Sequence, residues 1–111
     1  MNLKTNSKGE TTMRTGVLNG LDAEHPASGK VIVADGKIKL EDVTITEAPD
    51  ARVILSKDID ESTSVRCGAL KSFTGSHEYD IPSGATAEEY DSVVIWCDQF
   101  SVPIGQAKLS V

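Results

Sequence analysis

The stretch Ser92-Val-Val-Ile-Trp-Cys97 is the most apolar run of the chain, and it decides the fold class. None of its residues is charged, and three of them are the β-branched residues valine and isoleucine. A short continuous apolar run of this kind is typical of a strand that is buried on both faces. We therefore expect residues 92–97 to form the most buried strand of the molecule and Cys97 to be excluded from water.

Two runs of alternating apolar and polar residues lie upstream and are joined by a turn signal. The runs KVIVA (residues 30–34) and KIKLEDVTIT (residues 37–46) flank Asp35-Gly36, a dipeptide that strongly favours a β-hairpin. Within the second run the apolar positions change from even to odd residue numbers, and such a change requires a bulge or a bend. The sequence therefore predicts a hairpin with a bulge at Glu41-Asp42.

Turn residues and polar segments divide the rest of the chain. Pro49-Asp50 precedes a strand over residues 51–56, and the polar residues 57–64 predict a loop. Further short strands are expected over residues 65–70 (interrupted at Gly68), 77–81, 100–104 and 107–111, the last two being separated by Gly105. Thr86 and Glu89 have the spacing of a capping box, which predicts one helical turn over residues 87–91. The pattern predicts an all-β fold, a small antiparallel β-sandwich or barrel-like domain with at most one short helical turn.

Length and charge exclude several classes of protein. The 111 residues fit one domain, and we expect a disordered polar N-terminal tail over residues 1–14 before a β domain over residues 15–111. The formal net charge of −6 and the lack of a basic cluster argue against nucleic-acid binding. No run approaches the roughly 20 apolar residues that span a bilayer, so no membrane insertion is expected. The chain as written has no signal peptide and predicts a cytoplasmic protein; if a signal was removed, the protein is extracytoplasmic.

The cysteines Cys67 and Cys97 are the leading candidates for chemistry. They are bridged to each other, both free, or one buried and one reactive, and sequence alone does not choose among these states. Cys97 is either an inert core thiol, a redox thiol or a ligand to a prosthetic group. Its neighbour Asp98 would raise the thiol pKa, which counts against a strong nucleophile but less against an iron ligand, because the metal supplies positive charge.

The remaining candidate groups have ordinary structural interpretations beside the functional ones. Asp50 is a turn residue or a ligand-binding carboxylate. The histidines His25 and His77 do not combine with the cysteines in a zinc-binding spacing, so no metal site is expected. No enzyme motif is present, which favours a non-catalytic domain. Four aromatic residues either fill the core or form a sugar-binding platform: Trp96, Phe100, Tyr79 and Tyr90.

Four segments of the chain resemble the DM13 domain family. The most specific is DSVVIWCDQFSVPIGQAKL (residues 91–109), which is similar to the C-terminal signature of these domains. The others are KSFTGSHEYDIPSG (residues 71–84), HPASGKVIV (residues 25–33) and KIKLEDVTITEAPDARVILS (residues 37–56). Together the resemblance extends over residues 16–109.

The resemblance implies a sandwich-like electron-transfer or redox accessory domain that is usually exported and works with a redox partner protein. The family's motif cysteine maps onto Cys97, which would act as a naked thiol or bind a prosthetic group such as haem, with Trp96 beside it in the same signature. The alternative is a non-catalytic β-sandwich binding module for a protein or glycan, with Cys97 as a core residue. Three positions depart from the family pattern: Cys67 replaces an aliphatic residue, Ala48 replaces a glycine, and Pro103 interrupts a strand, which confines it to an edge or a bulge.

Overall fold

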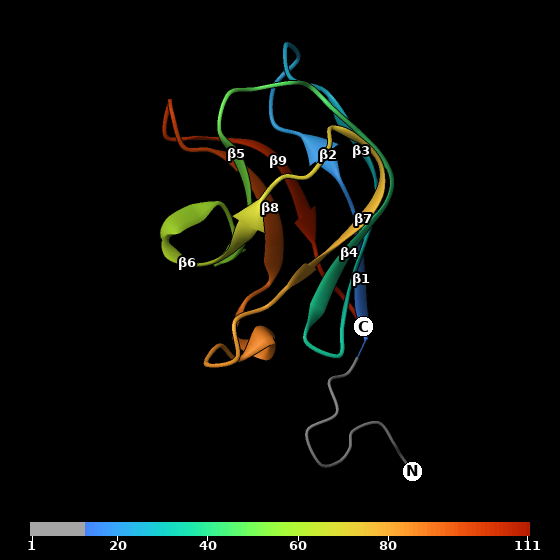
Figure 1. Cartoon of the computed structure of the whole chain (residues 1–111), viewed down its shortest axis with the longest axis vertical. Helices are drawn as coiled ribbons and strands as arrows, with labels where there is room; N and C mark the ends of the chain where they lie inside the picture. The colour runs from blue at the N-terminus through green and yellow to red at the C-terminus, as the bar shows by residue number, and fades with distance from the viewer. Residues whose placement is uncertain (1–12) are drawn as a thin grey trace.

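A computed structural model describes residues 13–111, which form two antiparallel sheets packed face to face (Figure 1). The elements are β1 (Arg14–Val17), β2 (Asn19–Gly20), β3 (Ala27–Ala34), β4 (Lys37–Ile45), β5 (Ala51–Lys57), β6 (Asp60–Ala69), β7 (Thr74–Asp80), the 3-10 turn η1 (Ala87–Glu89), β8 (Ser92–Cys97) and β9 (Val102–Lys108). One sheet has the order β1-β3-β4-β7 and the other the order β2-β9-β8-β5-β6. The predicted all-β sandwich with one helical turn is confirmed.

The main core lies between the two sheets. Alternate residues of β3 and β4 face alternate residues of β5 and β8, because successive side chains of a strand point to opposite faces. The fully buried members include Val31, Leu40, Leu55 and Ile95. Burial of such side chains is the main force that holds the sheets together.

The strand β8 is buried on both faces, as the apolar run predicts. It lies between β5 and β9, and all six of its residues are buried. On one face Val93, Ile95 and Cys97 belong to the main core, and on the other Val94 and Trp96 form a second cluster with Ile54. Sheet β2-β9-β8-β5-β6 therefore carries apolar clusters on both sides.

The predicted hairpin and bulge are also confirmed. The β3–β4 turn places Asp35 and Gly36 at φ values of +53° and +75°, the left-handed conformation that such a tight turn requires. The pairing of β4 with β7 shifts register between Leu40 and Val43, and Asp42 lies in this bulge at a φ of +49°. A second register shift, between Ile95 and Trp96, lies opposite Pro103, so the strand proline lies at a bulge as expected.

Three predicted interruptions are wrong. The strand β6 runs through Gly68 to Ala69, with only a register shift opposite Val53 and Ile54. Residues 57–64 are not a loop, because β6 begins at Asp60 after a two-residue turn; the segment is polar since β6 is the edge strand of its sheet. Gly105 does not divide the last strand, and β9 runs through it. An added Cβ at Gly105 would lie 3.2 Å from the Asn19 carbonyl oxygen, so this glycine allows β2 to approach closely.

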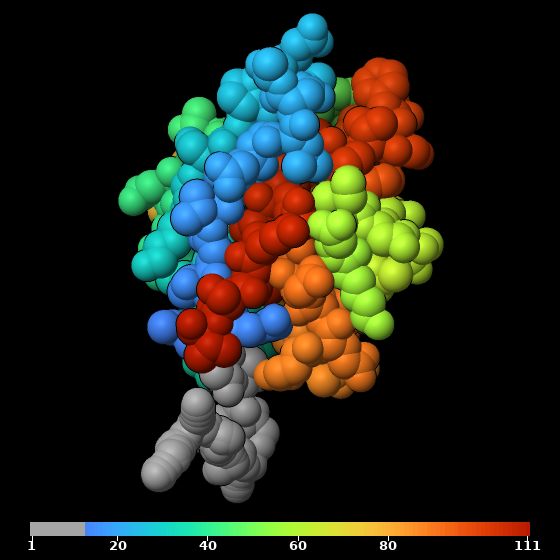
Figure 2. Space-filling view, turned by 180° about the vertical axis from the view of Figure 1, so that it is seen from behind, coloured from blue at the N-terminus to red at the C-terminus, as the bar shows by residue number. Residues whose placement is uncertain are grey.

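The ends of the described chain pack together. Figure 2 shows the C-terminal segment in red beside the N-terminal strands in blue, in agreement with the pairing of β2 with β9 and of Thr15 with Ser110. The predicted tail (residues 1–14) lies outside the described residues except for its last two, and Arg14 already belongs to β1. The capping box is wrong, because Thr86 makes no side-chain cap bond. Instead, the Arg14 guanidinium donates to the carbonyl oxygens of Ala87 and Tyr90, each at 2.8 Å.

Candidate functional site

The side chain of Cys97 is enclosed at one end of the sandwich. It is the last residue of β8, pairs with Ala51 on one side and Val102 on the other, and is 1% exposed. Its Sγ donates a hydrogen bond to the carbonyl oxygen of Pro49 at 3.1 Å. In this arrangement Cys97 is a protonated thiol, because the hydrogen bond uses its proton.

A five-residue segment, which we call the 46–50 loop (Thr46 to Asp50), joins β4 to β5 (Figure 1). Its Pro49 carbonyl oxygen accepts the hydrogen bond from Cys97, so the loop covers this thiol. Its first residue, Thr46, bonds to the Pro26 carbonyl oxygen through both its N–H (3.2 Å) and its hydroxyl (2.8 Å). Its last carbonyl, that of Asp50, accepts the N–H of Asp98 at 3.1 Å. Pro49 itself is exposed, so one turn of backbone separates Sγ from the surface.

The structure places Asp50 in the turn that precedes β5. Its φ of +56° is left-handed, and its Oδ1 accepts a hydrogen bond from Arg52 at 2.7 Å. Within residues 13–111, no three His, Cys, Asp or Glu side chains are arranged to hold a metal ion.

Trp96 lies on the opposite face of the sheet from Cys97. It is 9% exposed, and Arg52 is its cross-strand neighbour on β5. The next residue, Asp98, accepts hydrogen bonds from Arg66 at 2.8 Å and 2.9 Å and forms an ion pair with Arg52 at 3.3 Å. The hydrogen bonds from Arg66 and the charges of both arginines hold the pKa of Asp98 below its usual value. Trp96 and Cys97 therefore face opposite sides of the sheet, and any ligand of Cys97 would have to displace the 46–50 loop to reach Sγ.

The structure does not assemble the aromatic platform. Tyr79 is buried in the main core, and Trp96 is buried on the other side of the five-stranded sheet. Phe100 is 63% exposed on the turn between β8 and β9. Core packing therefore accounts for Tyr79 and Trp96.

Cys67 is separate from Cys97, and both thiols are free. Strand β5 lies between their strands, and two strand spacings amount to about 9.6 Å, whereas disulfides require Cα atoms within about 7 Å. A bridge between them would therefore require the sheet to rearrange. Cys67 is half-buried in the bulged part of β6, and burial raises its pKa to about 11.

A hollow near Cys67 was not foreseen from the sequence. It has a volume of about 400 Å³ and lies where the edge strands β6 and β7 meet; its lining includes Cys67, Lys37, Lys71 and Tyr79. Tyr79, which forms part of its wall, is hydrogen-bonded to His77, two residues earlier on β7. The only available signal was the spacing of these two residues, which puts both side chains on one face of a strand.

A family model described as "Electron transfer DM13" matches residues 21–109, which is most of the chain. No curated protein and no solved structure is similar enough to give a match. In the described part of the chain, no helix has the length and apolar character needed to cross a membrane.

Proposed function

The chain belongs to the DM13 electron-transfer family, and from this premise we propose that it is a redox accessory domain whose electron-carrying group is the thiol of Cys97. The observation that supports this assignment is the position of Sγ directly beneath the exposed Pro49. Opening the 46–50 loop would expose the thiol without separating the two sheets. The domain works with a redox partner protein and, as part of this proposal, outside the cytoplasm, where disulfides persist.

The proposed chemistry is thiol–disulfide exchange. The reactive form of a cysteine is its thiolate, so Cys97 must lose the proton that it donates to Pro49 when the loop opens. The thiolate then attacks a partner disulfide; a new S–S bond forms, the partner's S–S bond breaks, and the released sulfur leaves as a thiolate with the bonding electron pair. A second external thiolate then attacks the partner's sulfur in the mixed disulfide; a disulfide between these two external sulfurs forms, and Cys97 leaves as a thiolate with the bonding electron pair. A pair of electrons thus passes from the second thiol to the first disulfide.

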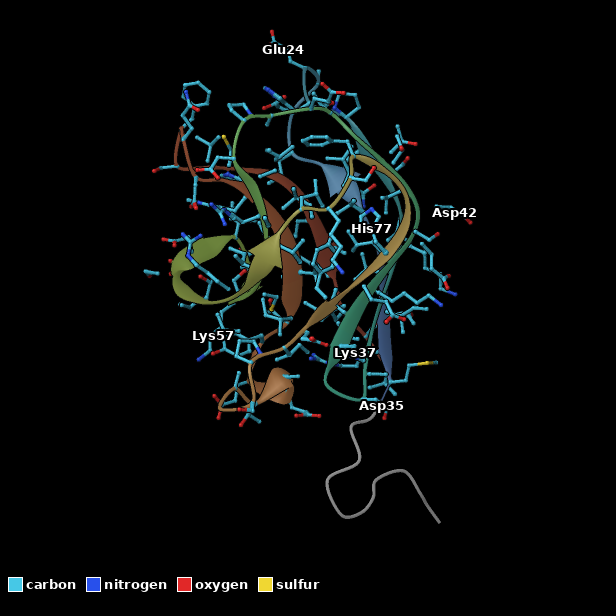
Figure 3. All side chains as sticks on the ribbon, in the orientation of Figure 1. Glu24, Asp35, Lys37, Asp42, Lys57 and His77 are labelled. Carbon is cyan, nitrogen blue, oxygen red and sulfur yellow. The ribbon has the colours of Figure 1, made fainter. Side chains whose placement is uncertain are left out.

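The loops around Cys97 indicate the charge of the partner. Three loops at this end of the molecule contain no lysine or arginine: residues 21–26, 46–50 and 98–101. Backbone hydrogen bonds join the 46–50 loop to each of the other two. Arg52 and Arg66 from the neighbouring strands pair with only part of the loops' charge. Figure 3 shows Glu24 at this end and Lys37 and Lys57 at the other. The partner would therefore present a basic surface to five carboxylates: Asp22, Glu24, Glu47, Asp50 and Asp98.

Disulfide probes of opposite charge test both the thiol and the charge. The folded chain and its Cys67→Ser variant are incubated with cationic cystamine or anionic oxidised glutathione, and mixed disulfides are measured by intact mass. We expect Cys97 to react in both proteins. Once the rate with each probe is divided by its rate with the unfolded chain, cystamine should react faster than oxidised glutathione, and this difference should shrink in high salt. Cys97→Ser is the matched control, and labelling confined to Cys67 would refute the assignment.

The burial of Cys97 favours a second candidate function, a binding module in which this residue only fills the core. In that case Cys97→Ser would leave binding of a protein or glycan unchanged, and the probes would not label Cys97. Adding haem to the folded chain distinguishes a third role of Cys97, as a haem ligand, from thiol exchange and from core packing. A haem absorbance band that is lost in Cys97→Ser would show ligation rather than exchange.

A further inference from the structure

Tyr79 and His77 form a partly buried hydrogen-bonded pair at the edge of the four-stranded sheet. They are two residues apart on β7, so both side chains lie on the face that packs against the core. Tyr79 is 3% exposed and His77 is half-buried. Tyr79 Oη lies 2.7 Å from His77 Nδ1, and the rings meet edge to face at 85°.

The other contacts of Tyr79 fix the direction of this hydrogen bond. The backbone N–H of Lys71 donates to Tyr79 Oη at 2.8 Å. We assign the tyrosine hydroxyl as the donor to Nδ1, because its oxygen already accepts one hydrogen bond and its proton has no other acceptor among the described residues. Neutral His77 then carries its own proton on Nε2, which has no partner in residues 13–111.

This environment opposes charge on the tyrosine ring. Burial raises the pKa of Tyr79, so the phenolate is disfavoured. The Lys71 ammonium lies 5.2 Å from the ring centroid, so a ring that lost an electron but kept its proton would carry a positive charge beside another one. Both states are avoided if the electron and the proton leave together.

We propose that Tyr79 and His77 are a second electron-carrying group, in which Tyr79 gives one electron to an external oxidant while its hydroxyl proton moves to Nδ1 of His77. The products are a neutral tyrosyl radical and an imidazolium ion, and no bond between heavy atoms forms or breaks. The oxidant is a high-potential metal centre of a partner protein, and return of one electron returns the proton to Tyr79. This role does not depend on Cys97.

The hollow between β6 and β7 lets an oxidant come near Tyr79, although the residue itself is only 3% exposed. Tyr79 forms part of its wall, beside Lys37 and Lys71, which attract an anionic oxidant, and beside Glu78 and Asp80, which oppose it. Electron transfer needs close approach to the ring rather than a bond to it. Cys67 lines the same hollow and can reduce a radical formed there, so the experiment must also be done without this thiol.

The test uses the full chain in the Cys67→Ser background, with hexachloroiridate(IV) as the one-electron oxidant. Freeze-quenched electron paramagnetic resonance identifies the radical, and stopped flow gives the rate. The chain has two tyrosines, so Tyr90→Phe is the matched control for Tyr79→Phe. His77→Gln keeps a hydrogen-bond acceptor but removes the base, which distinguishes proton acceptance from mere positioning.

We expect a tyrosyl signal in the parent chain, in Tyr90→Phe and in Cys97→Ser, and none in Tyr79→Phe. His77→Gln should slow the oxidation about 100-fold, the lower end of what a positioned base contributes, and should abolish the solvent deuterium effect on the rate. A radical on Tyr90 or Trp96, or an unchanged rate in His77→Gln, would overturn the proposal. If Tyr79→Phe does not fold, the rates of His77→Gln and Tyr90→Phe still decide the matter.

Discussion

Opening of the 46–50 loop should set the rate at which Cys97 reacts in the folded protein. In the Cys67→Ser variant, Cys97 is the one remaining thiol, so this variant reports on Cys97 alone. Exposure of Sγ breaks its own weak bond to Pro49 and three stronger bonds, two from Thr46 to Pro26 and one from Asp98 to Asp50. At about 1 kcal/mol net for each of the three stronger bonds, opening costs about 3 kcal/mol. Exposure of the half-buried Ala48 adds up to about 1 kcal/mol.

This cost corresponds to an open population of about one molecule in 100 to 1,000. We therefore expect iodoacetamide to alkylate Cys97 in the folded protein about 100- to 1,000-fold more slowly than in the urea-unfolded protein. The folded rate should be nearly independent of low urea concentrations, because a local opening exposes little surface. Thr46→Val removes one hydrogen bond of the loop and should speed the reaction about fivefold.

Global unfolding gives a different result. It costs about 5–15 kcal/mol in ordinary domains, so alkylation from the unfolded state would be slowed by more than about 1,000-fold. Its rate would also rise with urea as steeply as unfolding itself. That pair of results would show that Cys97 reacts only when the whole fold opens, and the proposed exchange chemistry would fail.

Three further predictions concern stability. Ile95→Ala should lower the free energy of unfolding by about 3 kcal/mol in urea titrations, whereas the exposed Ile59→Ala should change it by less than about 0.5 kcal/mol; equal effects would contradict the assigned core. Arg14→Ala removes two hydrogen bonds that a charged group donates to η1 and Tyr90, and it should lower the free energy of unfolding by about 2 kcal/mol. An unchanged thermal midpoint would show that these hydrogen bonds do not stabilise the fold. Burial raises the pKa of Cys67 from 9.0 to about 11, so between about pH 9 and pH 11 the thiol keeps its proton in the folded protein and loses it on unfolding. The free energy of unfolding should therefore fall as pH rises through this range. The decrease should be smaller in Cys67→Ser, and an identical pH profile in the two proteins would contradict the raised pKa.

The fold was predictable where side-chain pattern and turn chemistry agree. The apolar run ending at Cys97, the Asp35-Gly36 turn and the parity change at Asp42 are local signals, and each specifies a local conformation. The first half of β6, residues 60–64, was mistaken for a loop, because an edge strand needs no apolar pattern and its polar residues look the same as those of a loop. Gly105 was misinterpreted because a glycine that admits a neighbouring strand has the same sequence signal as one in a turn.

The site was only partly predictable, because its contacts join distant segments. The burial of Cys97 follows from its own strand, but its cover, Pro49, lies 48 residues away. The separation of Cys67 from Cys97 depends on the order of strands, which the spacing of two cysteines does not give. The pairing of Tyr79 with His77 required knowing which face of β7 meets the core.

The polar edge strand β6 also has a consequence for self-association. An unpaired strand edge is a template on which another chain can add a strand. In β6, Glu61 and Arg66 carry charges along this edge, and the register shift opposite Val53 and Ile54 interrupts its regular hydrogen-bonding pattern. These charges and this irregular pairing therefore protect the domain from edge-to-edge aggregation. The domain can then remain a separate molecule that is free to meet its partner.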